Sequence, residues 1–307
     1  MKPLRLAVLG VVLMGAWAAA QSQLLPTDFQ RTRVPGSELC LFWDIRDFPY
    51  QVDAAGSART PGDTEFAAIE AAFLSWQTVS NVCSDFVFTR GANAEAPLVR
   101  YVADGGTNEN VLTFREKACS EAVPEGDACL AEDTCSNKYQ CWDHSDGTIA
   151  LTVTTFSFKR AHILDADIEF NAAPQQGGAA NLFTTVSSPP CETPDVTCAA
   201  IDIQNTLTHE VGHALGLDHV AVTGSTMEAT APPGEISKRA IDRGSAGGFC
   251  EAYPAGLPSR QCSSSGQLNQ RIQAQSAGTS VGCNAGAAGF LPGLALLGLA
   301  AWKRRRR

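Results

Sequence analysis

The apolar positions of residues 64–82 recur at spacings of three and four, which predicts an amphipathic helix. Thr60, Asp63 and Thr64 are the candidate N-cap residues of this helix. The recurring apolar residues are Phe66, Ile69, Phe73, Trp76 and Val79. One face of the helix is therefore expected to pack against a core.

A second helical pattern covers residues 202–215, DIQNTLTHEVGHAL. Asp202 is a suitable N-cap, because its short carboxylate can accept hydrogen bonds from the free N–H groups of the first turn. The predicted buried stripe consists of Ile203, Leu207, Val211 and Ala214. The opposite face carries His209 and His213 and is therefore free to hold a ligand.

Five further segments have the composition or the alternation of β-strands. They are residues 39–45 (LCLFWDI), 85–89 (DFVFT), 98–102 (LVRYV), 148–156 (TIALTVTTF) and 164–171 (LDADIEFN). In the last segment Leu164, Ala166, Ile168 and Phe170 alternate with Asp165, Asp167 and Glu169. The three carboxylates share one face, which predicts either a solvated surface, the commoner case, or a structural calcium site.

Residues 1–20 have the layout of a secretory signal peptide, with two basic residues, a short apolar run and a final Ala-Ala-Ala. The run is short for the alternative, a transmembrane helix. Residues 21–37 follow as a short N-terminal segment. Residues 255–282 are rich in Ser, Gln, Gly and Ala and are expected to form a flexible linker.

Residues 283–307 contain Cys283, an apolar stretch and a basic block, which together form a stop-transfer pattern. This arrangement resembles the MYXO-CTERM type of surface-sorting tail, which implies that Cys283 is the processing or anchoring site. A plain membrane anchor is the alternative. The protein is thus expected to be exported and either anchored at the cell surface or outer membrane, or secreted after tail processing. Contact with the membrane is expected only through the tail.

Without these two ends the body is strongly acidic. Seven of the 23 basic residues lie in residues 1–20 and 283–307, and none of the 32 acidic residues does. The body keeps 16 basic against 32 acidic residues, a net charge of −16. Such a body repels nucleic acid, which we exclude as a partner, and it is expected to be monomeric.

Eleven cysteines in an exported chain favour disulfides, and ten remain once Cys283 is set aside. The expected pairs are Cys40–Cys83, Cys191–Cys198, Cys250–Cys262 and two among Cys119, Cys129, Cys135 and Cys141. The last four cysteines mark residues 119–141 as a disulfide-stapled surface insertion. A second zinc site there, with His144, is the alternative, but the close C-x-x-C pairs of such sites are missing.

Residues 209–219, HEVGHALGLDH, contain three of the five histidines of the chain. His209 and His213 lie one helical turn apart, so their imidazoles share a face. Gly216 can end the helix in a left-handed conformation and return His219 toward them. Three histidines with an open fourth position are typical of a catalytic zinc site.

Glu210 follows the first of these histidines and is the candidate general base for a water that zinc activates. His209, Glu210, His213, Gly216 and His219 match the metzincin signature H-E-x-x-H-x-x-G-x-x-H, and Met227 lies where the matrixin branch has its Met-turn. The chain therefore resembles the matrixin-type metzincin zinc metalloproteases. The similarity extends over most of residues 38–254.

The resemblance implies an α+β, zincin-like catalytic domain in residues 38–254. A twisted mixed β-sheet would pack against a long helix and the active-site helix, with a small C-terminal subdomain after His219. One catalytic Zn²⁺ would be held by His209, His213 and His219 above Met227, and proteins or peptides would be the substrates. The insertion 119–141 has no counterpart in the family, which leaves substrate preference open.

The segment that precedes the body, residues 21–37, is too short for a propeptide with a zinc-capping cysteine, so no thiol switch is expected. Two other functions stay open: a non-catalytic binding or adhesion module on the same fold, and a zinc hydrolase of cell-wall amides. Peptide hydrolysis is favoured because Glu210 and the three histidines are all present. His144 and His162 stand alone and are expected to be structural.

Overall fold

The computed structural model describes residues 29–58, 60, 62–103, 108–132, 134–174, 183–184 and 201–262. The predicted signal peptide, the sorting tail and the Cys191–Cys198 pair lie outside these residues, as does the linker beyond residue 262. Among the helices of the described ranges, none is long and apolar enough to cross a bilayer. The features below belong to residues 29–262.

A five-stranded mixed sheet has the strand order β3-β2-β4-β6-β5. Four strands are parallel: β2 (Asp47–Val52), β3 (Val87–Arg90), β4 (Asn110–Arg115) and β6 (Ile163–Asn171). The fifth, β5 (Ala150–Phe156), pairs with β6 in antiparallel orientation and lies at the edge. Among the described strands nothing pairs with the other side of β5, so its backbone groups there can bond another partner.

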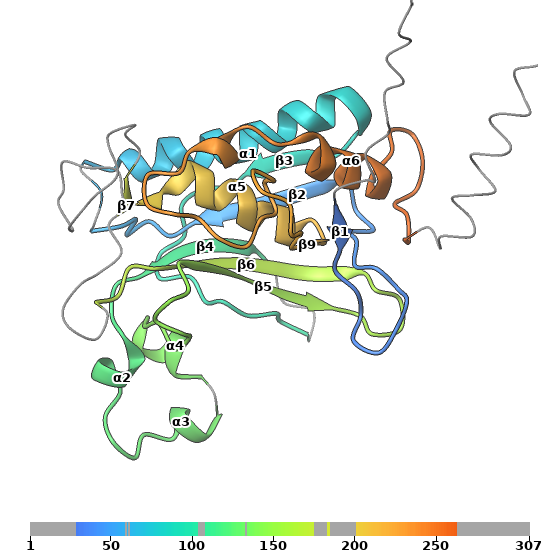
Figure 1. Ribbon diagram of the computed structural model, residues 1–307. Helices are drawn as coiled ribbons and strands as arrows, with labels where there is room; N and C mark the ends of the chain where they lie inside the picture. The colour runs from blue at the N-terminus through green and yellow to red at the C-terminus, as the bar shows by residue number, and fades with distance from the viewer. Residues whose placement is uncertain are drawn as a thin grey trace, which may run out of the picture. The chain divides into compact units, whose positions relative to one another are not determined.

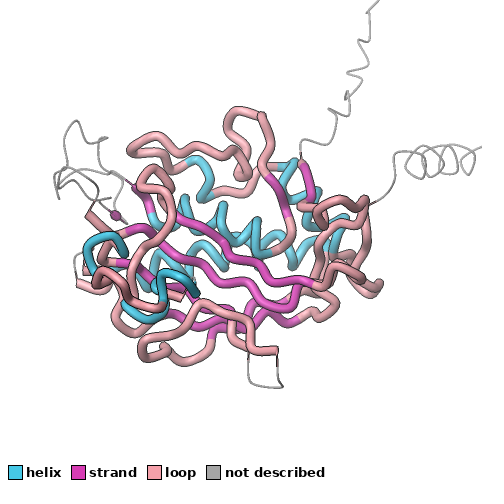
Figure 2. Tube along the Cα trace, turned by 90° about the horizontal axis from the view of Figure 1, so that it is seen from below, coloured by secondary structure: helices cyan, strands magenta, loops and turns pink. Residues whose placement is uncertain are grey.

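Two long helices, α1 (Thr64–Cys83) and α5 (Ile203–Ala214), cover one face of this sheet (Figure 1). The view from below in Figure 2 shows the strands in front of both helices. Outside residues 119–141, the other described elements are α6 (Arg243–Ala252), a 3₁₀ turn at Ser237–Arg239 and two short strand pairs. The pairs are β1 (Gln30–Arg31) with β9 (Leu217–Asp218), and β7 (Phe183–Thr184) with β8 (Ile201–Asp202). This architecture fits the α+β class expected from the sequence.

Both predicted helices are confirmed, and so are the strands predicted at 85–89, 148–156 and 164–171, within a few residues at their ends. Helix α1 buries Ile69, Phe73 and Trp76, three residues of its predicted stripe. At its start Asp63 occupies the N-cap position, but no side chain caps the helix there.

The strands predicted at 39–45 and 98–102 are wrong. Residues 39–45 form only isolated bridges. Leu41, Phe42 and Trp43 are buried, and Trp43 Nε1 donates to Ala214 O at the end of α5 at 2.7 Å, whereas Ile45 is 51% exposed. The backbone of Val99 bonds the side chain of Asn137 instead of a strand. The strand in this part of the chain is β4, whose six residues are all buried.

The carboxylate face of β6 is not a solvated surface, which corrects the commoner of the two sequence interpretations. Asp165, Asp167 and Glu169 are each at most 2% exposed, whereas Leu164, predicted on the apolar face, is 38% exposed. Glu169 is ion-paired with Arg115, so the three carboxylates do not converge on one point. Calcium binding at Asp165 and Asp167 stays a prediction.

Burial raises the pKa of Asp165 and of Asp167, and the two carboxyl groups interact. Within the described ranges, one oxygen of each has no hydrogen-bond partner, while the other Asp167 oxygen accepts from Val111 N at 2.9 Å. A carboxyl with a raised folded-state pKa binds its proton more tightly when folded. Each of these carboxyl groups therefore stabilises the folded protein fully at a pH below the ordinary carboxyl pKa. This stabilisation is lost as the pH rises through the raised pKa of the folded state.

We expect the free energy of unfolding to fall as pH rises from about 4 to about 8, and Asp165→Asn to flatten this fall because it removes the interacting charge beside Asp167. At pH 8 the variant should gain about 1–3 kcal/mol, the usual cost of an unsatisfied buried polar group. Urea unfolding measured against pH checks this, with the exposed Glu95→Gln as the control. An unchanged pH slope would contradict it, and added Ca²⁺ that stabilises the native protein but not Asp165→Asn would support calcium binding.

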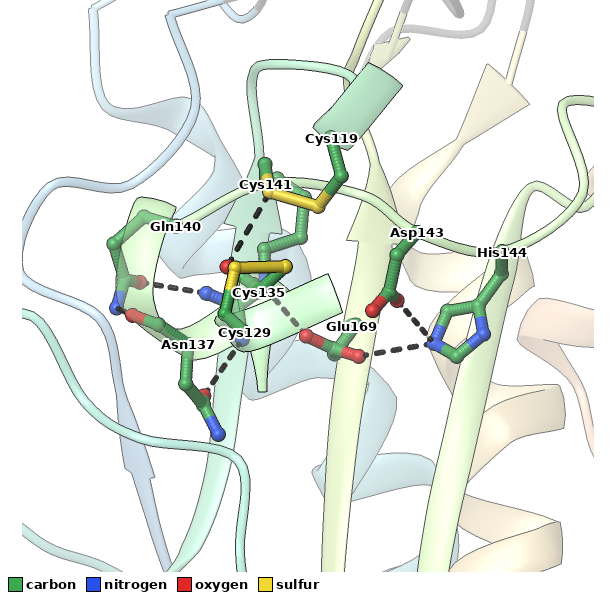
Figure 3. Close-up of a disulfide and its surroundings, with 10 residues drawn as sticks. Cys119, Cys129, Cys135, Asn137, Gln140, Cys141, Asp143, His144 and Glu169 are labelled. Carbon is green, nitrogen blue, oxygen red and sulfur yellow. Dashed lines mark hydrogen bonds and ion pairs between the residues drawn. A yellow bond between two sulfur atoms is a disulfide. The ribbon is translucent and has the colours of Figure 1, made fainter. Parts of the chain in front are cut away.

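The insertion at residues 119–141 is a stapled surface unit, as predicted. It contains the short helices α2 (Cys119–Ala122), α3 (Cys129–Glu132) and α4 (Cys135–Tyr139), and its disulfides are Cys119–Cys141 and Cys129–Cys135 (Figure 3). Because all four cysteines are paired, a zinc site formed by their thiolates is ruled out.

Outside the insertion, the predicted pairs Cys40–Cys83 and Cys250–Cys262 are wrong. The bridges are Cys40–Cys262 and Cys83–Cys250. Cys83 is the last residue of α1, and Cys250 lies in α6, which packs against α1. The disulfide pairing follows from the packing of two helices that lie far apart in the sequence. The spacing of the cysteines along the chain does not reveal this packing.

Candidate metal centre and cleft

Helix α5 presents the histidine face because its opposite face is fixed in the core. Ile203, Leu207, Val211 and Ala214, the predicted stripe, are fully buried. The helix begins after Asp202, whose side chain accepts from Asn205 N at 2.7 Å, as the sequence predicts. The histidine side chains therefore start from a rigid element.

The chain bends at Gly216, which has φ of +84°, a conformation that glycine adopts without strain. A Cβ atom there would lie 2.6 Å from Leu41 O, so the position also lacks space for a side chain. Thr32 N donates to Gly216 O at 2.9 Å and holds the bend from the N-terminal segment. The bend returns His219 to the face of α5.

The three imidazoles meet at their Nε2 atoms. His209 Nε2 lies 3.1 Å from both His213 Nε2 and His219 Nε2, and the last two atoms are 3.0 Å apart. Within the described ranges this is the one group of three or more potential ligands whose donor atoms converge. A triangle of this size lets one ion reach all three nitrogens at a usual Zn–N distance of about 2.0–2.1 Å.

The protonation of the imidazoles also suits a cation. His209 Nδ1 lies 2.7 Å from Thr226 O and His213 Nδ1 lies 2.9 Å from Leu217 O, which assigns the ring protons to Nδ1 and leaves Nε2 as an acceptor. Burial, together with His213, lowers the pKa of His209 to about 3, and burial also lowers the pKa of His213 and of His219. Neutral rings with converging lone pairs fit Zn²⁺.

Met227 packs against α5 near this centre, and its carbonyl accepts from Val220 N at 3.0 Å. It is fully buried, and its sulfur would collide with a Cβ atom at Gly212, the residue before His213. The carbonyl of the neighbouring Thr226 accepts a hydrogen bond from His209 Nδ1. Thr226 N in turn donates to Asp242 Oδ2 at 2.7 Å. Asp242 also caps α6, so the closing helix and the centre are linked through one carboxylate.

Glu210 is 6% exposed and lies beside the centre with its carboxylate held from the edge strand. Thr152 Oγ1 on β5 lies 2.7 Å from Glu210 Oε2 and 3.0 Å from Glu210 O. Burial raises the pKa of Glu210 to about 7, and the Thr152 hydrogen bond acts in the opposite direction. A bound cation would also lower the pKa of Glu210. The group is thus suited to take up a proton near neutral pH.

Thr152→Val should move the acidic limb of the kcat/KM profile to higher pH by about one unit, because it removes a hydrogen bond that favours the ionised carboxylate. The measurement is hydrolysis of one peptide from pH 4 to 9. Thr152→Ser should restore the limb, and Thr155→Val on the same strand serves as the control. A limb that does not move in Thr152→Val would disprove this role of Thr152.

The centre opens into a cleft of about 780 Å³ that runs along β5. Its walls are α5, β5 and the segment after Met227, and they include Thr152, Thr206 and Lys238. Sequence reasoning missed these three residues. Thr152 lies 58 positions from Glu210, and no local pattern links the two.

His144 and His162 are not part of the centre. His144 Nε2 lies 3.5 Å from carboxylate oxygens of Asp143 and Glu169, and His162 packs edge-on against Phe42. Both positions agree with the structural roles expected for them.

The family model described as Matrixin matches residues 42–248, which include the sheet, α1, α5 and all three histidines. A search of curated proteins finds no match.

Proposed function

This chain belongs to the matrixin family of zinc metalloproteases, and from that premise we propose that it is an endopeptidase that hydrolyses peptide bonds of extracellular proteins. The observation that supports the proposal most directly is the convergence of three neutral Nε2 atoms beside a buried, hydrogen-bonded carboxylate. A metal-binding module without catalysis has no need of that carboxylate.

His209, His213 and His219 would hold the metal, and the Nδ1 contacts of His209 and His213 fix the orientations of these two rings. When bound, Zn²⁺ supplies Lewis acidity, which lowers the pKa of a water and polarises a peptide carbonyl. Glu210 takes the proton from that water and returns it to the departing amine. Thr152 holds the Glu210 carboxylate toward the centre in the meantime.

The cleft supports a peptide substrate because one of its walls is an edge strand. Among the strands that the structure describes, β5 pairs with β6 alone, and residues Ala150–Thr152 line the cleft. An extended peptide can add to such an edge through backbone hydrogen bonds, which places its carbonyl groups in a defined register. Neither a folded nucleic acid nor a compact small molecule needs this kind of wall.

We further propose that the protein is exported, that its body acts as a monomer and that residues 283–307 anchor it at the cell surface. The four disulfides of the described ranges support an oxidising compartment. The test is fractionation of intact cells with an antibody to the body. Detection in the cytosol alone would contradict the proposal.

The activity is tested with the purified full chain on casein, gelatin and peptidoglycan. We expect internal cleavage of the two proteins, loss of cleavage in a zinc chelator and recovery on adding Zn²⁺. Release of peptidoglycan fragments with intact casein and gelatin would favour a cell-wall amidase instead. Zinc binding without hydrolysis of any of the three would favour an adhesion module.

A further inference from the structure

The edge strand β5 connects two surface features that the catalytic groups do not use. It follows the insertion in the chain and leads into the turn to β6, which lies at the end of the sheet away from the insertion (Figure 1). The cleft lining includes Gly147 near one feature, Phe156 near the other and Thr152 between them. A peptide that pairs with β5 beside the metal centre therefore approaches both features when it extends in both directions.

At the insertion end, a recess of about 390 Å³ lies next to the cleft. Its lining includes Asp146, the residue before Gly147, together with Glu121 and Asp143. All three carboxylate residues are exposed, and no lysine or arginine of the described ranges lines the recess. Even with a protonated His144, the lining keeps an excess of negative charge. This charge is open to a substrate that leaves the cleft at this end.

Backbone hydrogen bonds around Trp142 hold the acidic recess beside the cleft. Cys119 N donates to Trp142 O at 2.8 Å, and Trp142 N donates to Lys117 O at 2.7 Å. These bonds join the base of the insertion to the segment that leads into β5. Asn171 Nδ2 of β6 donates to Thr148 O at 2.9 Å and fixes the same segment to the sheet. The carboxylates therefore keep a defined position relative to β5.

At the other end, the turn from β5 to β6 presents Lys159 and Arg160. Both residues are exposed, and neither forms an ion pair with another described residue. The neighbouring Phe158 is 69% exposed, and its ring lies 5.1 Å from the ring of Phe156, which lines the cleft. Two cations and an apolar ring thus lie directly beyond this end of the cleft.

The β5–β6 turn is also fixed in place. Ala161 N donates to Ser157 O at 2.7 Å within the turn, and Phe42 N donates to Ala161 O at 3.1 Å. Asp44 lies close to the turn, with its Oδ2 3.9 Å from His162 Nδ1. One carboxylate offsets at most one of the two cations, so the turn keeps an excess of positive charge.

The two ends of β5 therefore differ in the sign of their charge. Antiparallel pairing, the more stable kind, places the N-terminal side of a peptide toward the β5–β6 turn and its C-terminal side toward the insertion. Phe156 lies four positions after Thr152, which is about 13 Å along a strand. A peptide residue about five positions from the scissile bond is thus far enough away to reach the charges at either end.

We propose that the protein selects substrates with acidic residues about five positions N-terminal to the scissile bond and basic residues about five positions C-terminal to it. The inference rests on the proposed peptidase function and names the substrate class of that same cleft. Lys159 and Arg160 attract the acidic residues, whereas Glu121, Asp143 and Asp146 attract the basic ones. A substrate with the reversed arrangement meets like charges at both ends.

The test uses the purified full chain and one uncharged peptide that it cleaves in a broad library, with the cleaved bond located by mass spectrometry. The matched peptide carries two glutamates on the N-terminal side and two lysines on the C-terminal side, at the stated distance from that bond. The reversed peptide exchanges the two pairs, and the neutral peptide has glutamines in all four places. Two further peptides carry only the glutamates or only the lysines of the matched peptide.

We expect kcat/KM for the matched peptide to exceed that for the reversed peptide by about tenfold at an ionic strength of about 0.02 M. At about 0.5 M the ratio should fall to about twofold, because salt screens exposed charges. The neutral peptide should lie between the two. The difference should appear mainly in KM, because the charged groups lie far from the reacting bond.

Two double variants separate the two ends. Lys159→Gln with Arg160→Gln should abolish the preference for the glutamate-only peptide over the neutral one, while the preference for the lysine-only peptide stays. Glu121→Gln with Asp146→Asn should have the opposite effect. If the second double variant fails to fold, the first variant and the peptide series still decide the result.

Arg243→Gln and Glu95→Gln are the matched controls. Each removes one exposed charge outside the linings of the cleft and of the acidic recess, and each should leave both preferences unchanged.

Equal cleavage of the matched and the reversed peptide at low ionic strength would overturn the inference. A preference for glutamate that survives the loss of both Lys159 and Arg160 would overturn it as well. Either result would leave the peptidase function standing, because peptides would still be cleaved. If the wild-type protein cleaves no peptide, the proposed function fails and the inference fails with it.

Discussion

Glu210→Gln is expected to lower kcat by about 10²–10⁴-fold, the range typical of a general base, while the protein keeps its zinc. The substitution preserves the shape of the side chain and the contact with Thr152 Oγ1, but it removes the group that accepts the proton. KM should change little, because the side chain binds no part of the substrate ground state. Initial rates on a fluorogenic peptide, together with zinc content, give the result.

Glu95→Gln, the same kind of substitution at an exposed position outside the cleft lining, is the control for purification and assay. Its rate should match that of the wild-type protein. If Glu210→Gln retains more than a tenth of the wild-type kcat with zinc bound, another group supplies the base and the assignment of Glu210 is wrong.

Arg115→Met is expected to lower the free energy of unfolding by about 3–5 kcal/mol, because it leaves the buried Glu169 carboxylate without its cation. The Arg115 side chain is fully buried on β4, where its Nε donates to Glu169 and its two amino groups to Gln140 and Asn137 of the insertion. Glu169, Gln140 and Asn137 are labelled in Figure 3. Chemical denaturation monitored by tryptophan fluorescence measures the loss.

The double variant Arg115→Met with Glu169→Gln is the matched comparison. It removes both charges, so it should recover part of the stability that Arg115→Met loses. Arg33→Met removes an arginine of an exposed ion pair and should change stability by less than about 1 kcal/mol. Equal stability of Arg115→Met and the wild-type protein would show that the buried pair does not hold the insertion against the sheet.

The metal centre could be predicted from the sequence because its parts are local. His209 and His213 are one turn apart on a helix with a clear apolar stripe, and the bend at Gly216 returns His219 within three residues. This geometry depends on the constant pitch of an α-helix and on one glycine, and both can be inferred from the amino-acid sequence.

The parts that could not be predicted depend on contacts between distant segments. Strand β4 is central and buried on both faces, so it lacks the alternation that identifies a half-exposed strand. The pairing of Cys83 with Cys250 follows from the packing of α6 on α1. Thr152 reaches Glu210 only because β5 lies beside α5.

The burial of Asp165 and Asp167 shows a further limit of pattern reasoning. Strict alternation identified the strand correctly, but it could not tell whether the polar face meets solvent or another layer of the protein. Here the polar face is covered, and the cost appears as the raised pKa of both carboxyl groups.

The most direct test of the account is the zinc content of the purified full chain, measured by elemental analysis after dialysis against metal-free buffer. We predict one zinc ion per chain in the wild-type protein and in Glu210→Gln, and a nearly complete loss in His213→Ala, which removes one of the three nitrogens. A wild-type protein that binds no zinc, or a His213→Ala variant that keeps the full amount, would contradict the account.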